Sequence, residues 1–165
     1  MTRILFLCTG NTCRSPVAEV VSRRLFRELD LDFRSVGLDA RSGQPASPES
    51  RAWTEAAGIS LADHGSRPVS ADILKGTSWV IGMTRSHAAI FRSRFGDAYA
   101  GSIGMLGDPG VDLGRSGYSG DAEEVPDPYG GSPENYALVC EQIARLCAAW
   151  GPCFRSLAVR KDLES

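Results

Sequence analysis

Apolar and polar residues alternate along the chain in blocks that fit strands followed by helices. The first block, Ile4 to Leu7, is a short and continuously apolar run, which is typical of a strand buried on both faces of a parallel sheet. After the polar segment 8–14, apolar residues return at helical spacing, with Ser15 expected as N-cap and Pro16 as the first helical residue. The chain therefore begins with a predicted strand, loop and helix.

The rest of the chain repeats this order of strand and helix. Residues 107–126 are rich in glycine and acidic residues without a period and predict a loop, and the tail 151–165 is left unassigned. The alternation predicts one three-layer α/β domain over residues 1–165, with about four parallel strands, helices on both faces and a phosphate-binding loop after the first strand. The remaining strands are predicted at 33–38, 78–83 and 102–106, and the remaining helices at 47–58, 85–96 and 132–151.

A cysteine and an arginine, Cys8 and Arg14, bracket the first polar loop. Backbone N–H groups converge at such a helix N-terminus, where the helix dipole also favours an anion. These donors and the guanidinium favour a thiolate over a thiol, so Cys8 is a candidate nucleophile. Arg14 is suited to hold two phosphoryl oxygens, and the Ser15 hydroxyl can hydrogen-bond the sulfur when it leaves. The loop therefore predicts phosphoryl transfer.

Composition and charge narrow the class of protein. With 18 basic and 20 acidic residues, the 165-residue chain has a net charge of −2, which gives no footprint for nucleic acid or a membrane surface. The apolar run after Arg3 is too short for a signal peptide, and no stretch reaches transmembrane length. With a mechanism that needs a reduced thiol, this predicts a cytoplasmic protein, and we expect a monomer. The five cysteines have no spacing typical of a disulfide framework.

Two motifs resemble those of the low-molecular-weight protein tyrosine phosphatases: "CTGNTCRSP" at residues 8–16, and the later "VPDPYGGSPENY", which contains Asp127. The resemblance covers about residues 3–150. It implies hydrolysis of phosphorylated protein side chains through a phosphocysteine intermediate, without a metal or another cofactor. It also implies that Asp127 protonates the departing group and then activates water. The residues expected to bind phosphate are Thr9, Gly10, Asn11, Thr12, Cys13, Arg14 and Ser15.

Further roles follow from the resemblance for Asn11, and from the residues themselves for Cys13 and the histidines. Asn11 is expected in a left-handed conformation, where its hydrogen bonds fix the loop. Cys13 is expected to protect Cys8 from oxidation by forming a reversible disulfide with it. The histidines, His64 and His87, do not fit a metal site or a triad, and structural roles at a helix end or in a loop are expected for them.

The substrate is the finer question. Tyrosine phosphatases of the family usually carry a bulky aliphatic residue where this chain has Thr12. The stretches "CTGNTCRSP", "MTRSH" and "DPYGGS" resemble the protein arginine phosphatases of the family more closely. Phosphoarginine is therefore favoured over phosphotyrosine, with the Thr12 hydroxyl as an acceptor for guanidinium N–H groups and Tyr129 as a stacking wall.

Two other functions use the same loop. Thioredoxin-coupled arsenate reductases look similar there but need two further cysteines on a mobile segment. Here Cys140 and Cys147 lie on one face of a strongly periodic helix, which favours packing in the core. A catalytically silent phosphate-binding module would not need Cys8, Arg14 and Asp127 together, so a phosphatase is the better hypothesis.

Overall fold

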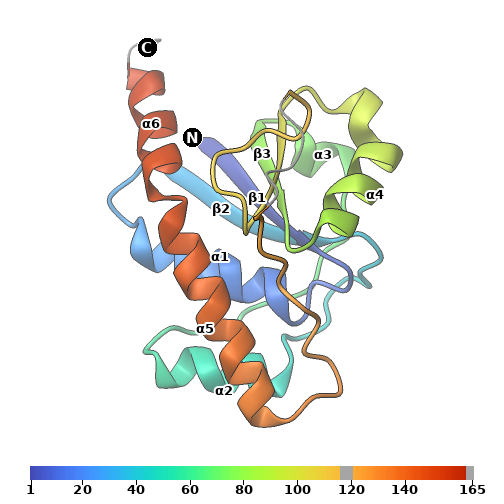
Figure 1. Cartoon of the computed structure of the whole chain (residues 1–165), viewed down its shortest axis with the longest axis vertical. Coiled ribbons are helices and arrows are strands. Elements are labelled where there is room, and N and C mark those ends of the chain that lie inside the picture. Colours follow the sequence, from blue (N-terminus) through green and yellow to red (C-terminus); the bar gives the residue numbers. More distant parts are fainter. Residues whose placement is uncertain (116–120, 163–165) are drawn as a thin grey trace.

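The computed structural model of the chain describes residues 1–115 and 121–162, and side chains in these ranges up to residue 159. Four strands within them form one sheet, with all neighbouring pairs parallel and the order β2-β1-β3-β4 (Figure 1). This confirms the predicted α/β class. The strands are β1 (Thr2–Cys8), β2 (Leu31–Gly37), β3 (Thr77–Gly82) and β4 (Ser102–Met105).

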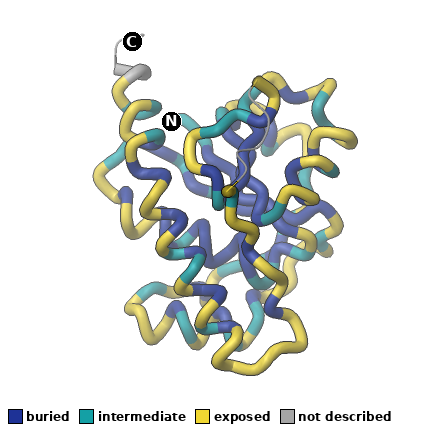
Figure 2. The backbone as a smooth tube through the Cα atoms, in the orientation of Figure 1, coloured by how far each residue is buried: buried dark blue, intermediate teal, exposed yellow. Residues whose placement is uncertain are grey.

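Helices cover both faces of the sheet, as predicted. A large core joins one face to α1 and the C-terminal helices, and a smaller core joins the other face to α3 and α4. Figure 2 shows the buried sheet between exposed outer surfaces. The helices are α1 (Arg14–Leu25), α2 (Pro48–Ala56), α3 (Ala71–Leu74), α4 (Arg85–Phe95), α5 (Pro133–Ala149) and α6 (Gly151–Asp162), with a 3-10 turn, η1 (Gly96–Ala98), after α4.

The apolar run of β1 is continuous because its side chains supply both cores. Ile4 and Phe6 point into the large core, whereas Leu5 and Leu7 point into the small one, and all four are fully buried. Cys8 is the last residue of the strand, with β2 on one side and β3 on the other. Helices leave opposite faces of the sheet at this point, which is where open α/β sheets bind ligands.

Two helices were not predicted from the sequence. The first is α3, a single turn capped by the Ser70 hydroxyl, which accepts a hydrogen bond from the Ile73 N–H. The second is α6: α5 ends before Gly151, as predicted, but the unassigned tail forms a further helix. It is held by Phe154, which is fully buried and packs edge-on against Phe26 and Phe33.

The predicted loop 107–126 contains no helix or strand in its described part, residues 107–115 and 121–126, and its residues 116–120 lie outside the described residues. A single bridge joins Gly107 to Glu123. Helix α4 ends at Phe95, and the backbone continues into η1 because Gly96 keeps a right-handed helical conformation. Across the described residues, no helix has both the length and the apolarity needed to cross a membrane.

Candidate active site

The β1–α1 loop, defined as residues 8–15, surrounds the Cys8 sulfur with hydrogen-bonding groups. The Asn11 N–H donates to Cys8 Sγ at 3.3 Å, and Ser15 Oγ lies 2.9 Å from the same sulfur. Cys8 is only 2% exposed, at the carboxyl end of β1. A backbone donor, a hydroxyl and the start of α1 thus converge on one sulfur.

Ser15 is not the N-cap that the sequence predicts. The helix begins at Arg14, its N-cap is Cys13, and no side chain caps it. The Ser15 hydroxyl serves the loop instead, because it contacts Cys8 Sγ and accepts a hydrogen bond from Asn11 Nδ2 at 2.9 Å. Pro16 is consequently the third helical residue, two positions later than expected, still at a place where a missing N–H costs the helix nothing.

The backbone conformation and hydrogen bonds of Asn11 fix the shape of the loop. Its φ is 57°, the left-handed conformation predicted for it, and its side chain is fully buried. The side-chain amide donates to Ser15 Oγ and to Ser35 Oγ on β2, each at 2.9 Å, and its Oδ1 accepts from the Arg67 N–H at 2.9 Å. His64 Nε2 lies 2.7 Å from the Asn11 carbonyl oxygen.

Close packing against β2 also holds the loop. A Cβ placed on Gly37 would lie 2.5 Å from the Thr9 carbonyl oxygen and 2.9 Å from the Asn11 nitrogen. These are backbone atoms, so only glycine lets the loop approach the strand this closely.

The Arg14 guanidinium reaches across to the segment that carries Asp127. Its Nη1 donates to the Val125 carbonyl at 3.1 Å, and its Nη2 lies 3.8 Å from Asp127 Oδ2. The arginine side chain is 6% exposed, whereas that of Asp127 is 58% exposed. Within the described residues, the buried Arg14 Nε has no hydrogen-bond partner. An unsatisfied donor on a buried cation beside Cys8 is suited to an oxyanion.

Thr12 and Tyr129 lie on the same open cleft beside the loop. The cleft is bounded by Thr12 and Cys13 of the loop, by the start of α2, and by Tyr129 and Tyr136. Tyr129 is 83% exposed, and its N–H donates to Asp127 Oδ1 at 3.1 Å. Thr12 and Tyr129 therefore share this cleft, and Asp127 lies next to it through its contact with the Tyr129 N–H.

Both histidines contact the β1–α1 loop, which the sequence analysis did not predict. His87 is buried, with Nε2 3.0 Å from Thr9 Oγ1 and Nδ1 3.1 Å from Thr84 Oγ1. Burial, reinforced by the Arg14 guanidinium, lowers the pKa of His87 from 6.5 to about 4, so its ring is neutral at pH 7. The available signals were the stretches "DHGSRPVS" and "MTRSH", in which each histidine follows a strand or turn next to the loop.

The other cysteines have different surroundings. Cys140 and Cys147 are buried in the large core as predicted, and burial raises the pKa of each thiol to about 12. This position does not suit the redox cascade of an arsenate reductase. Cys13 Sγ lies 3.8 Å from the Tyr136 hydroxyl and 3.7 Å from Thr12 Oγ1.

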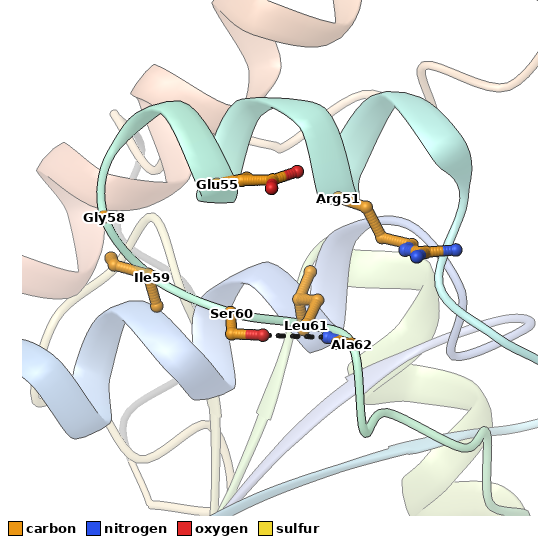
Figure 3. A pocket seen from close by; sticks show the side chains of 7 residues that line it. All are labelled: Arg51, Glu55, Gly58, Ile59, Ser60, Leu61 and Ala62. Carbon is orange, nitrogen blue, oxygen red and sulfur yellow. Dashed lines mark hydrogen bonds between the residues drawn. The ribbon is translucent and has the colours of Figure 1, made fainter.

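A separate pocket lies between α2 and residues 58–62 (Figure 3). Its polar side chains include Arg51 and Glu55 from the helix, and the Ala62 N–H donates to Ser60 Oγ at 3.1 Å on the opposite wall. No residue of the β1–α1 loop lines it, so it is distinct from the candidate active site.

Comparison with known proteins agrees with this geometry. The sequence model of the family described as low molecular weight phosphotyrosine protein phosphatase matches residues 3–163. A protein-arginine-phosphatase of Bacillus subtilis is 30% identical over 145 residues, 87% of this chain and 90% of that protein. The low molecular weight protein-tyrosine-phosphatase PtpB of Staphylococcus haemolyticus is 32% identical over 144 residues, 87% of this chain and 94% of that protein. Among solved structures, an arginine phosphatase from Geobacillus stearothermophilus superposes with a TM-score of 0.80 at 27% identity, covering 97% of each chain.

Proposed function

Because this chain is a phosphoprotein phosphatase that belongs to the low molecular weight phosphotyrosine protein phosphatase family, we propose that its substrates are proteins phosphorylated on arginine. Relatives named for phosphoarginine and for phosphotyrosine are similarly close, at 30% and 32% identity, so the proposal rests on the cleft. The observation that carries it is that Thr12 and Tyr129 line one open cleft beside the β1–α1 loop that carries Cys8.

The chemistry begins with Cys8. In our proposal its thiolate attacks phosphorus while the N–H groups of the β1–α1 loop and the Arg14 guanidinium bind the phosphoryl oxygens. The unpartnered Arg14 Nε supports this role, because a phosphoryl oxygen would satisfy it and the charge that builds in the transition state would strengthen the contact. Ser15 Oγ, 2.9 Å from the sulfur, stabilises the thiolate when it leaves the phosphocysteine.

Asp127 supplies the proton that the departing nitrogen or oxygen needs. Its side chain is 58% exposed, and Oδ2 lies 3.8 Å from Nη2 of Arg14, which in our proposal holds the phosphoryl group. After phosphoryl transfer, the carboxylate accepts a proton from the water that attacks phosphocysteine. One residue serves both steps because the first step leaves it deprotonated.

Thr12 decides which side chain is preferred. A phosphoarginine guanidinium brings N–H donors into the cleft, and each donor left unpaired there costs about 1–3 kcal/mol. The Thr12 hydroxyl offers an acceptor, and the exposed Tyr129 ring offers a face for stacking. A phosphotyrosine ring has no such donors and gains more from a larger aliphatic wall. Phosphotyrosine is the second candidate, because PtpB, which is named a protein-tyrosine-phosphatase, is 32% identical over 87% of this chain.

The test is to replace Thr12 by isoleucine, which keeps the β-branch and removes the hydroxyl. We expect Thr12→Ile to lower kcat/KM for phosphoarginine peptides by at least about 10-fold, equivalent to about 1.4 kcal/mol, and to maintain or raise it for phosphotyrosine peptides. Thr12→Val is the matched control, because it also lacks the hydroxyl but adds no length. An unchanged ratio of the two constants in both variants would contradict the role of Thr12.

We also propose that the protein acts in the cytoplasm as a monomer on phosphorylated proteins. The mechanism requires a reduced thiol, and Cys8 forms no disulfide in the structure. In our proposal, neither catalysis nor binding requires a second subunit, because Cys8, Arg14 and Asp127 come from one chain.

A further inference from the structure

We propose that a shallow apolar groove between α2 and the start of α5 binds an apolar side chain of the substrate protein, a few residues from the phosphorylated one. The inference rests on the proposed function only in that the substrate is a protein. It adds a sequence preference around the phosphorylated residue, which the chemistry at Cys8 does not require.

The groove is built from small and ring-shaped side chains of two helices. Figure 1 shows α2 beside the N-terminal end of α5. Ala52 and Ala137 leave space between the helices, and the Trp53 ring is half-buried between that space and the large core. Glu49 is the charged residue among those that line it. The lining is Pro48, Glu49, Ala52, Trp53, Pro133 and Ala137.

This groove continues the cleft at the active site. Pro48 and Glu49 line both hollows, and the Ser47 N–H donates to the Thr12 carbonyl at 2.8 Å, which attaches the start of α2 to the β1–α1 loop. From Ser47 to Ala52 the helix rises about 7.5 Å, at about 1.5 Å per residue. An extended peptide covers that distance in about two to three residues, at about 3.3 Å each.

The occupant follows from the shape and position of the groove. It is too shallow to hold an independent partner by itself, but a substrate already held by its phosphoryl group presents its neighbouring side chains at high effective concentration. A leucine two to four residues from the phosphorylated position would cover the exposed faces of Ala52 and Pro48. Weak apolar contacts of this kind then raise kcat/KM.

The experiment is a leucine scan of short peptides. One series carries phosphoarginine and a second carries phosphotyrosine, each with alanine elsewhere and a single leucine moved from four residues before to four residues after the phosphorylated position. We expect a gain of about 5-fold in kcat/KM, relative to the all-alanine peptide, at a position two to four residues away, since about half of a leucine side chain becomes buried.

Variants of both walls locate the effect. Ala52→Gln and Ala137→Gln place a longer polar side chain in the groove without changing the charge, and glutamine suits a helix. We expect either variant to reduce the leucine gain below about 2-fold. Ala148→Gln, an exposed position on the same helix as Ala137 and three turns away, is the matched control and should retain the gain. Turnover of p-nitrophenyl phosphate reports the folded fraction of each preparation.

The outcomes separate this inference from the proposed function. If only the phosphotyrosine peptides are cleaved and they show the leucine gain, the phosphoarginine assignment is contradicted and the groove is supported. Cleavage of phosphoarginine peptides without any leucine preference would support the assignment and contradict the groove. A leucine gain that persists in both Ala52→Gln and Ala137→Gln would also contradict the groove, because the leucine would then bind elsewhere.

Discussion

At the scale of single residues, we expect the contribution of Asp127 to kcat to depend strongly on the leaving group of the substrate. Replacing it by asparagine keeps an acceptor for the Tyr129 N–H and removes the proton. We expect Asp127→Asn to lower kcat by about 10²–10⁴-fold for a phosphopeptide, and by much less for p-nitrophenyl phosphate, whose leaving group departs without protonation.

The control for this comparison is Asp121→Asn, an exposed carboxylate further from Arg14 along the same segment. It should retain both activities. If Asp127→Asn slows both substrates equally, Asp127 is not the acid for the leaving group.

Cys13 is the residue that we expect to make oxidation of Cys8 reversible. Peroxide converts the Cys8 thiolate to sulfenic acid, and attack by the Cys13 thiol forms a disulfide and releases water. After peroxide and then dithiothreitol, the unmodified protein should recover most of its activity and Cys13→Ser should recover little. Cys153→Ser, a half-buried cysteine on α6, is the control. Equal recovery of activity by Cys13→Ser and the unmodified protein would contradict this role of Cys13.

At the scale of elements, the turn from β3 into α4 joins the two halves of the site. The Met83 carbonyl accepts from the Val125 N–H at 3.0 Å, and the Arg85 N–H donates to Glu124 Oε1 at 2.8 Å. His87 in the same turn contacts Thr9 of the β1–α1 loop. This turn thus sets the position of Asp127 relative to Cys8.

The buried His87 makes the free energy of unfolding of the protein depend on pH. Its pKa is lowered from 6.5 to about 4 in the folded protein, so as pH falls the unfolded chain takes up the proton first. The resulting loss of stability begins near pH 6.5 and is complete below about pH 4, reaching about 2 kcal/mol between pH 7 and pH 5. Above pH 7 the effect is absent, because His87 is neutral in both states.

Urea unfolding at pH 7 and pH 5 measures this loss. His87→Gln keeps a side chain that can hydrogen-bond but does not titrate, so its free energy of unfolding should fall by about 2 kcal/mol less over this range. His64, whose pKa burial also lowers, contributes the same loss to both proteins. The same pH dependence in the two proteins would contradict a buried neutral His87.

The sequence predicts most of these elements because local signals and burial agree. The apolar run of β1, the Ser47 and Ser132 caps and Gly151 at the end of α5 each act through neighbouring residues. Helix α6 was missed because its stability comes from distant contacts of Phe154 with Phe26 and Phe33. Its positions 150, 154 and 157 had helical spacing that could have been used.

The residues of the candidate site divide in the same way, into those that local motifs mark and those that distant contacts determine. Cys8, Arg14 and Asp127 stand in recognisable motifs, so the sequence alone singles them out. The prediction of Ser15 as N-cap was wrong because its hydroxyl contacts Cys8 and Asn11 instead. These contacts form only in the folded structure, so the local sequence carries no signal for them. The contacts of the two histidines with the loop depend on the packing of β2 and β3 around β1, which a histidine count cannot reveal.

At the scale of the whole molecule, the parallel sheet concentrates chemistry at one edge. The order β2-β1-β3-β4 places Cys8 at the carboxyl end of a central strand, and the start of α2, residues 129–131 and Tyr136 line the open cleft beside its loop. The sheet therefore fixes Cys8 and Arg14, whereas Tyr129, which we propose meets the substrate, is exposed.

We propose that the active site at this edge of the sheet prefers phosphoarginine to phosphotyrosine. The most direct measurement is kcat/KM of the unmodified protein on two peptides that are identical except for phosphoarginine or phosphotyrosine, with Cys8→Ser protein as the background. We predict a preference of at least about 10-fold for phosphoarginine, equivalent to about 1.4 kcal/mol. Equal constants, or a preference for phosphotyrosine, would contradict the claim and assign the protein to phosphotyrosine.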